Sequence, residues 1–198
     1  MGKNVLILTL VSFLAGCVSM TVHAPDWDRS VDFSGFKTYA WAPGEQSRTG
    51  DPRLDNALTD TRVRASVDKA LALKGYRKTE AENPDFWVSY HLAVKNKAEV
   101  MTIPAANYAP VSVSSNGTII TNNWGVGFLE SQTLVDPYEE GTLWVDILDP
   151  RSSQVIWRAS VSRVMEDAKS PEARDRRVFD GVSRLLEKFP PPKKISAA

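Results

Sequence analysis

The chain begins with a short apolar run that limits what the rest of it can form. Val5–Leu14 spans about ten residues, and Lys3 places a positive charge just before it. This length is typical of the hydrophobic region of an export signal and falls short of the roughly 20 residues that a membrane-spanning helix needs. The run therefore predicts a leader that is removed, so that the fold is built by the residues after it.

The leader ends in Leu14-Ala15-Gly16-Cys17, which resembles the lipobox of bacterial lipoproteins. The resemblance implies signal cleavage between Gly16 and Cys17 and lipidation of Cys17, which is the only cysteine of the chain. Each buried CH₂ of an acyl chain contributes about 0.8 kcal/mol, so a diacylglycerol with a further acyl group such as palmitate anchors a protein firmly. The alternative is an ordinary export signal that happens to contain a cysteine.

The residue after the cysteine is Val18 and not aspartate. By resemblance to sorting rules in enterobacteria, this favours transfer to the outer membrane, with the protein facing the periplasm. Since the lipid occupies the one thiol, no disulfide can form in that oxidising compartment, and stability must come from packing.

Removal of residues 1–16 leaves 182 of the 198 residues, which is enough for one domain with a substantial core. The mature part carries 23 Lys and Arg against 24 Asp and Glu, because Lys3 is the only charged residue of the leader. A nearly neutral chain argues against a nucleic-acid partner and against electrostatic docking to membranes. We expect a lipidated tether over 17–30, a single domain over 31–190 and a disordered tail over 191–198.

Two helices have clear start signals. Asp51 can cap a first helix with Pro52 at its first position and Gly75 at its end, and Ser170 can cap a second with Pro171 at its first position. Apolar residues recur at mostly helical spacing in both, and core packing explains these stripes better than a cofactor site does. The expected inward residues are Leu54, Leu58, Val63, Val67, Ala70 and Leu71, then Val178, Val182, Leu185, Leu186 and Phe189.

Three segments have the pattern of strands. Val31–Ala42 is rich in aromatic residues and has a break at Ser34-Gly35. Phe86–Lys95 alternates strictly, and Gly141–Asp149 alternates before a turn and a partner strand that together predict an antiparallel hairpin. The strand Phe86–Lys95, the strand Gly141–Asp149 and its hairpin partner have these expected inward residues: Phe86, Val88, Tyr90, Leu92, Val94, Leu143, Val145, Ile147, Val155, Trp157, Ala159 and Val161. The sequence therefore predicts an α+β fold, an antiparallel or mixed sheet with two main helices packed on one face.

Residues 98–140 form an odd region in which short strand-like pieces lie among prolines and glycines. Asn116-Gly117 is a strong hairpin signal that joins 110–115 to 118–124, and we expect a long, irregular β-arm. Four aromatic residues of the arm are candidates for a surface that contacts protein or glycan, although packing on the arm's own sheet also explains them. They are Tyr108, Trp124, Phe128 and Tyr138.

The sequence offers little for catalysis. His23 lies in the tether and His91 on the expected solvent-facing side of a strand. Neither has a second histidine or cysteine nearby in the sequence to complete a metal site. Turn and strand-end roles explain Asp85 and Asp149, and the chain has no nucleophile elbow, P-loop or dinucleotide fingerprint. We therefore expect a protein that is not an enzyme and holds no cofactor or metal.

Six short motifs, in order and spacing, resemble the bacterial lipoprotein family called domain of unknown function 4136. They are Asp32–Trp41, Leu73–Tyr76, Pro84–Val88, Glu140–Asp146, Val155–Arg158 and Lys188–Pro191. The resemblance covers nearly all of the mature chain and implies an α+β periplasmic domain behind a lipobox. It supplies no established activity and no catalytic residues.

Two functions from different classes remain. The first is an envelope interaction or structural module that binds the membrane through its lipid and an envelope protein, or a second copy of itself, through the 98–140 arm and its sheet edge. The second is a lipoprotein that holds a glycan or an apolar molecule between the sheet and the helices. A hydrolase ranks far below both, because no nucleophile and base can be named.

Overall fold

The computed structural model describes residues 20–44, 49–81, 83–103, 111–113, 119–121 and 132–192. The strands are β1 Met20–Val22, β2 Asp26–Trp27, β3 Thr38–Trp41, β4 Arg77–Lys78, β5 Phe86–Ile103, β6 Val111–Val113, β7 Ile119–Thr121, β8 Gln132–Leu148 and β9 Val155–Val164. The helices are α1 Ala57–Leu73 and α2 Pro171–Leu186, with a short 3₁₀ turn, η1, at Phe33–Gly35.

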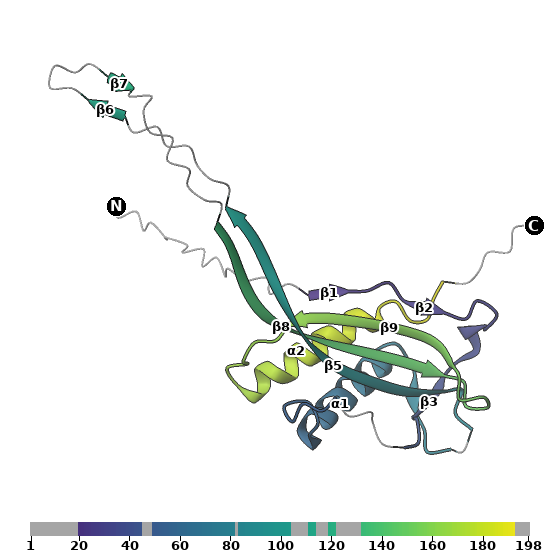
Figure 1. Cartoon of the computed structure of the whole chain (residues 1–198). Helices are drawn as coiled ribbons and strands as arrows, with labels where there is room; N and C mark the ends of the chain where they lie inside the picture. Colours follow the sequence, from purple (N-terminus) through teal and green to yellow (C-terminus); the bar gives the residue numbers. More distant parts are fainter. Residues whose placement is uncertain are drawn as a thin grey trace, which may run out of the picture.

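The main sheet has seven strands in the order β1-β9-β8-β5-β3-β4, with β2 also paired to β9. The pairs are antiparallel except that β3 runs parallel to both β4 and β5. Both helices cover the same face of this sheet (Figure 1). The predicted α+β class, with a mixed sheet and two helices on one face, is confirmed.

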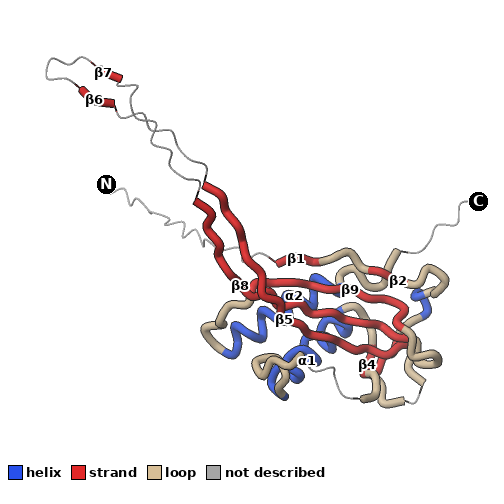
Figure 2. The backbone as a smooth tube through the Cα atoms, viewed as in Figure 1, coloured by secondary structure: helices blue, strands red, loops and turns tan. Residues whose placement is uncertain are grey.

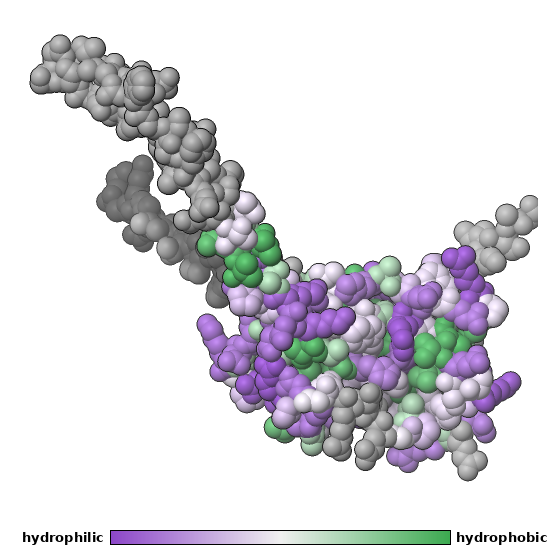
Figure 3. Space-filling model, in the orientation of Figure 1, coloured by the Kyte–Doolittle hydropathy of each residue, from purple (hydrophilic) through white to green (hydrophobic). Residues whose placement is uncertain are grey.

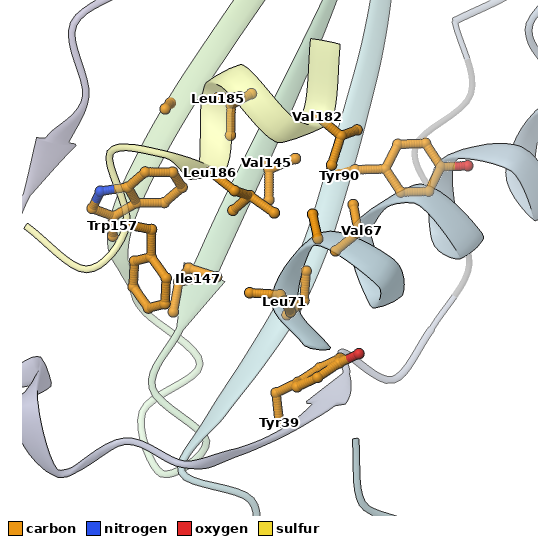
Figure 4. Packing of buried hydrophobic residues seen from close by; sticks show 14 of the residues in the cluster. Tyr39, Val67, Leu71, Tyr90, Val145, Ile147, Trp157, Val182, Leu185 and Leu186 are labelled. Carbon is orange, nitrogen blue, oxygen red and sulfur yellow. The ribbon is translucent and has the colours of Figure 1, made fainter. Parts of the chain in front are cut away.

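The core lies between the helices and the sheet (Figure 4). Alternation places Phe86, Val88 and Tyr90 of β5 inward, and Val182, Leu185 and Leu186 of α2 belong to the same buried cluster. The Phe189 ring lies against the Phe86 and Trp157 rings, at centroid distances of 5.5 and 5.2 Å. This aromatic cluster joins the end of α2 to the middle of the sheet.

Helix α1 begins later than the sequence predicts. Asn56 is the cap, and its side-chain oxygen accepts a hydrogen bond from the Thr59 N–H at 3.0 Å. Asp51 instead closes a preceding turn, accepting from the Arg53 N–H. Leu58 therefore falls on the outer face of the first helical turn and is 67% exposed, so its assignment to the core was wrong. Gly75 ends the helix as expected, with φ +89°.

The N-terminal segment is not only a tether. Residues 20–22 and 26–27, inside the range expected to be a spacer, pair with β9 as β1 and β2. The His23 N–H also donates to the Ser160 carbonyl at 2.9 Å. Strands of two and three residues are too short to give a sequence pattern, and their pairing partners lie between 130 and 143 residues later in the chain.

Two strand predictions also change. The aromatic segment 31–42 divides into η1 and β3, with the break at the expected place, Ser34-Gly35. In β9 a register irregularity opposite Ile147 and Leu148 leaves Ile156 as an extra residue. Val155 consequently turns outward and is 44% exposed, whereas Trp157 is buried as predicted.

A candidate interaction surface on the β5–β8 arm

Strands β5 and β8 extend well beyond the sheet as a two-stranded ribbon (Figures 1 and 2). Their register runs without a break from Trp87 opposite Leu148 to Ile103 opposite Gln132. Strand β3 pairs with β5 only as far as Val88, and β9 pairs with β8 only as far as Glu140. We call residues 95–103 and 132–140 the arm; they form a regular ladder, although the sequence suggested an irregular one.

The arm displays aliphatic side chains on both of its faces. Val100 lies opposite Val135, and Met101 lies opposite Leu134, so the two pairs point to opposite faces of the ribbon. All four side chains are between 52% and 62% exposed. Figure 3 shows apolar residues gathered where the arm leaves the domain. Exposed apolar side chains concentrated on a projecting element are typical of a contact surface.

Three polar contacts lie at the base of the arm, and two of them link it to the domain. Arg53, in the turn before α1, donates from both terminal nitrogens to Glu139, at 2.7 and 2.9 Å, and this contact lowers the pKa of Glu139. The Lys97 ammonium lies 2.6 Å from Glu140, a hydrogen bond that raises the pKa of Lys97. The Met165 N–H donates to the Glu139 carbonyl at 2.8 Å. Glu139 therefore contacts both the turn before α1 and the residue after β9.

The predicted site residues fall in different places. Tyr138 lies on β8 opposite Lys97 and is half-buried. Tyr108, Trp124 and Phe128 lie outside the described residues, as do Gly16 and Cys17. The Asn116-Gly117 signal also lies outside them, but β6 and β7 on either side form the expected antiparallel pair, with Val113 opposite Ile119.

The four exposed aliphatic residues of the arm were not predicted from the sequence. A signal was present, because Val100-Met101 and Leu134-Val135 are adjacent apolar pairs in segments that otherwise carry polar residues. Adjacent residues of a strand point to opposite faces, so each pair puts one apolar side chain on each face.

The face of the sheet away from the helices carries a polar cluster centred on Asp146. Its carboxylate, with a side chain only 1% exposed, accepts two hydrogen bonds of 2.6 Å from Arg158 and lies 3.1 Å from His91 Nε2. Both oxygens are thus held by partners on neighbouring strands, which is a structural arrangement. Among the described residues, no group of three or more His, Cys, Asp or Glu side chains is placed to hold a metal ion.

The two aspartates that the sequence assigned to turn or strand-end roles both accept structural hydrogen bonds, Asp85 at the start of β5 and Asp149 in the turn before β9. The Asp85 carboxylate accepts from the N–H groups of Lys37 and Thr38 at 2.9 and 2.8 Å, and these bonds lower its pKa. Asp149 accepts from the Arg151 N–H and the Ser152 hydroxyl, and its pKa is also lowered.

Side chains fill the space between the sheet and the helices. Val67, Leu71, Val145, Ile147 and Leu185 all have no exposed surface there. A hollow with a volume of about 590 Å³ lies elsewhere, at the end of the sheet, between residues 27–34 and the prolines 190–192. No helix in the part of the chain that the structure describes is long and apolar enough to cross a membrane.

A family profile described as "Domain of unknown function (DUF4136)" matches residues 23–191. The chain belongs to the DUF4136 family. The match begins directly after β1 and ends in the proline segment after α2, so it covers β2 to α2 of this DUF4136 protein. No curated protein matches the chain.

Solved structures resemble this DUF4136 protein at low sequence identity. A DUF4136 family protein from Bacteroides thetaiotaomicron VPI-5482 is 12% identical, with a TM-score of 0.47 over 86% of this chain and 96% of that one. A PDZ domain protein from Parabacteroides distasonis ATCC 8503 is 14% identical, with a TM-score of 0.49; 89% of this chain spans 38% of that protein. PelC from Paraburkholderia phytofirmans, a dodecamer, is 11% identical, with a TM-score of 0.41 over 85% and 95% of the two chains.

Proposed function

We propose that this protein is a non-catalytic module of the bacterial envelope, anchored in the outer membrane by lipid on Cys17, that contacts an envelope partner through its arm. The arm carries the proposal, because Val100, Met101, Leu134 and Val135 expose apolar surface on an element that adds nothing to the core. The polar groups elsewhere support a non-catalytic role, since Asp85, Asp146 and Asp149 are occupied by structural hydrogen bonds.

Lipid on Cys17 would hold the domain close to the bilayer. Strand β1 begins at Met20, and three residue steps of extended chain reach about 10 Å. Met20 lies opposite Arg163 of β9, which in turn lies opposite Gly141 at the base of the arm. The end of the sheet from which the arm projects is therefore the end nearest the membrane.

The anchor is tested by replacing Cys17 with serine. Labelled palmitate incorporates into the full chain and not into Cys17→Ser, which also leaves the membrane fraction of the cell. Equal labelling of both chains, or membrane retention of the serine variant, contradicts the proposed lipid anchor. Neither result bears on the role of the arm, which is tested separately.

The role of the arm is tested by removing it. Residues 96–139 are replaced by Asn-Gly, which joins Lys95 to Glu140, a pair in register. The deletion removes the Arg53–Glu139 ion pair but no residue of the core, so the thermal unfolding midpoint stays within a few degrees of the parent.

Both chains are then crosslinked in intact cells and isolated by an affinity tag. The full chain retains discrete crosslinked proteins that the folded deletion variant lacks. If the variant retains the same set, the arm is not the contact element. A ligand held between sheet and helices, the second function considered, is not favoured by this geometry, because side chains fill that space.

A further inference from the structure

The two edges of the arm differ in their capacity to accept another strand. The Val88 carbonyl of β5 accepts from the Ala42 N–H at 2.8 Å, so the backbone groups of Val88 point away from β8. The β5–β8 register is unbroken, so the same direction recurs at every second residue. The N–H and C=O groups of Asn96, Ala98 and Val100 thus face outward, and among the described residues no strand pairs with them.

The outer edge of β8 lacks a backbone N–H donor at Pro137, the residue opposite Ala98. The Glu139 carbonyl points outward to the Met165 N–H, and Pro137 lies two residues away, so its nitrogen faces the same edge. Proline has no N–H to give, and prolines at such positions protect sheet edges from pairing. An incoming strand therefore finds a complete set of backbone partners on β5 and an interrupted one on β8.

The charges on the arm are unbalanced in a single chain. Glu99 of β5 lies directly opposite Asp136 of β8, and like charges at opposed positions destabilise a ribbon. The structure gives Glu99 no hydrogen bond or ion pair among the residues that it describes. Lys97, two residues away on the same face, binds Glu140 with one of its three N–H donors. A cation placed beside Glu99 would offset the repulsion.

We propose that β5 of one chain pairs antiparallel with β5 of a second copy, around a two-fold axis at Ala98. In this register each Lys97 lies opposite the partner copy's Glu99, and the two small Ala98 side chains meet at the axis. The Lys97–Glu99 pairs fall at the closely spaced positions of the ladder, about 4.5 Å between Cα atoms, where opposite charges attract best. The result is a four-stranded ribbon, β8-β5-β5-β8.

This inference rests on the proposed role of the arm in binding and names its partner as a second copy of the chain. Self-pairing at a two-fold axis is the simplest closed arrangement for an edge whose charges are complementary to themselves. The β5 edge then loses its unpaired backbone groups, and the Pro137 edge stays on the outside of the ribbon.

Cysteine scanning tests the register in the full chain, extracted from membranes in detergent. The wild-type chain is the background control, because its single cysteine is Cys17. Ala98→Cys places two sulfurs across the axis at Cα atoms about 5.5 Å apart, which a disulfide can bridge, whereas Asn96→Cys and Val100→Cys are each too far from their own copies. Val135→Cys is the matched control on β8, with similar exposure to Val100.

Under mild oxidation, Ala98→Cys gives at least about tenfold more disulfide dimer than either neighbour alone, because only its sulfurs lie within bonding distance. A mixture of Asn96→Cys and Val100→Cys chains gives the heterodimer that neither gives alone. Absence of the Ala98→Cys dimer, equal dimer at all three positions, or more dimer at Val135→Cys overturns the proposal. Capture of other proteins by the arm without the Ala98→Cys dimer overturns self-pairing and leaves the binding role of the arm intact.

Charge exchange tests the ion pairs separately. Lys97→Glu and Glu99→Lys each raise the dimer dissociation constant about tenfold, since each places two like-charged pairs across the axis. The double variant K97E/E99K restores it. Glu99→Lys also relieves the repulsion from Asp136 within the chain, so a loss of dimer in this variant does not come from a weakened arm. Unchanged dissociation in both single variants contradicts the register.

Discussion

Arg158 on β9 donates from Nε and Nη2 to the two carboxylate oxygens of Asp146 on β8, each at 2.6 Å. The two side chains differ sharply in exposure, since that of Asp146 is 1% exposed and that of Arg158 is 49% exposed. The pair therefore joins two central strands through one buried and one half-exposed charge. This asymmetry decides which partner is more costly to lose.

Arg158→Met should destabilise the fold more than Asp146→Asn does. Without the guanidinium, the buried Asp146 carboxylate keeps its contact with His91 and loses both 2.6 Å hydrogen bonds, and we expect a loss of about 2 to 4 kcal/mol in the free energy of unfolding. Without the carboxylate, Arg158 turns to water, and the loss is about 1 to 2 kcal/mol. Urea unfolding followed by tryptophan fluorescence measures both, and the reverse order contradicts this account.

Phe189 should be among the most sensitive positions of the chain. Its ring is fully buried against Phe86, Tyr76 and Trp157, so Phe189→Ala leaves a cavity and costs about 3 to 5 kcal/mol. Leu58→Ala is the control, because Leu58 is exposed and its loss stays within about 0.5 kcal/mol. Equal effects of the two substitutions would mean that the end of α2 is not packed as described.

The cap of α1 can be tested with a conservative pair. Asn56→Ala removes the acceptor for the Thr59 N–H and the amide that donates to the Pro52 and Arg53 carbonyls, and should cost about 1 to 2 kcal/mol. Asn56→Asp keeps the acceptor and loses the two donated bonds, so its cost should lie between that of alanine and zero. Calorimetric unfolding of both variants gives the comparison. If alanine and aspartate behave alike, the helix does not depend on this cap.

Asp85→Asn should destabilise the fold in a manner that depends on pH. Backbone hydrogen bonds from Lys37 and Thr38 lower the pKa of Asp85 below its ordinary value of 3.8. A carboxylate with a lowered folded-state pKa contributes stability above the unfolded value and loses it as the pH falls through the folded value. The gap between parent and variant is therefore full above about pH 5 and closes below about pH 3.8. A gap that stays constant between pH 3 and pH 7 contradicts this assignment.

The parts of the fold that the sequence predicts well are those with strong local periodicity. Strict alternation in β5 identified Phe86, Val88 and Tyr90 as inward residues, and the Ser170 cap with Pro171 located the start of α2. The start of α1 was predicted wrongly, because Asp51-Pro52 and Asn56 are both acceptable helix-start signals. The turn in which the Asp51 carbonyl accepts from Leu54 and Asp55 separates Asp51 from the helix and leaves Asn56 as the cap.

The remaining features depend on partners far away in the chain. Strands β1 and β2 are five residues in total and exist through pairing with β9, which no local pattern predicts. The aliphatic surface of the arm was missed for a related reason. Val100 is exposed because β3 stops pairing with β5 at Val88 and β9 stops pairing with β8 at Glu140. Where these pairings stop is set by tertiary contacts and not by the local sequence.

The proposed role of the arm is to bind another protein. The most direct measurement places a photoreactive amino acid at Val100 in the full chain, with Val155 as a control that is exposed but lies on β9, away from the arm. After irradiation of intact cells, we expect a discrete protein adduct or a self-adduct at Val100 and none at Val155. No protein adduct at Val100, or the same adducts at both positions, would contradict the claim.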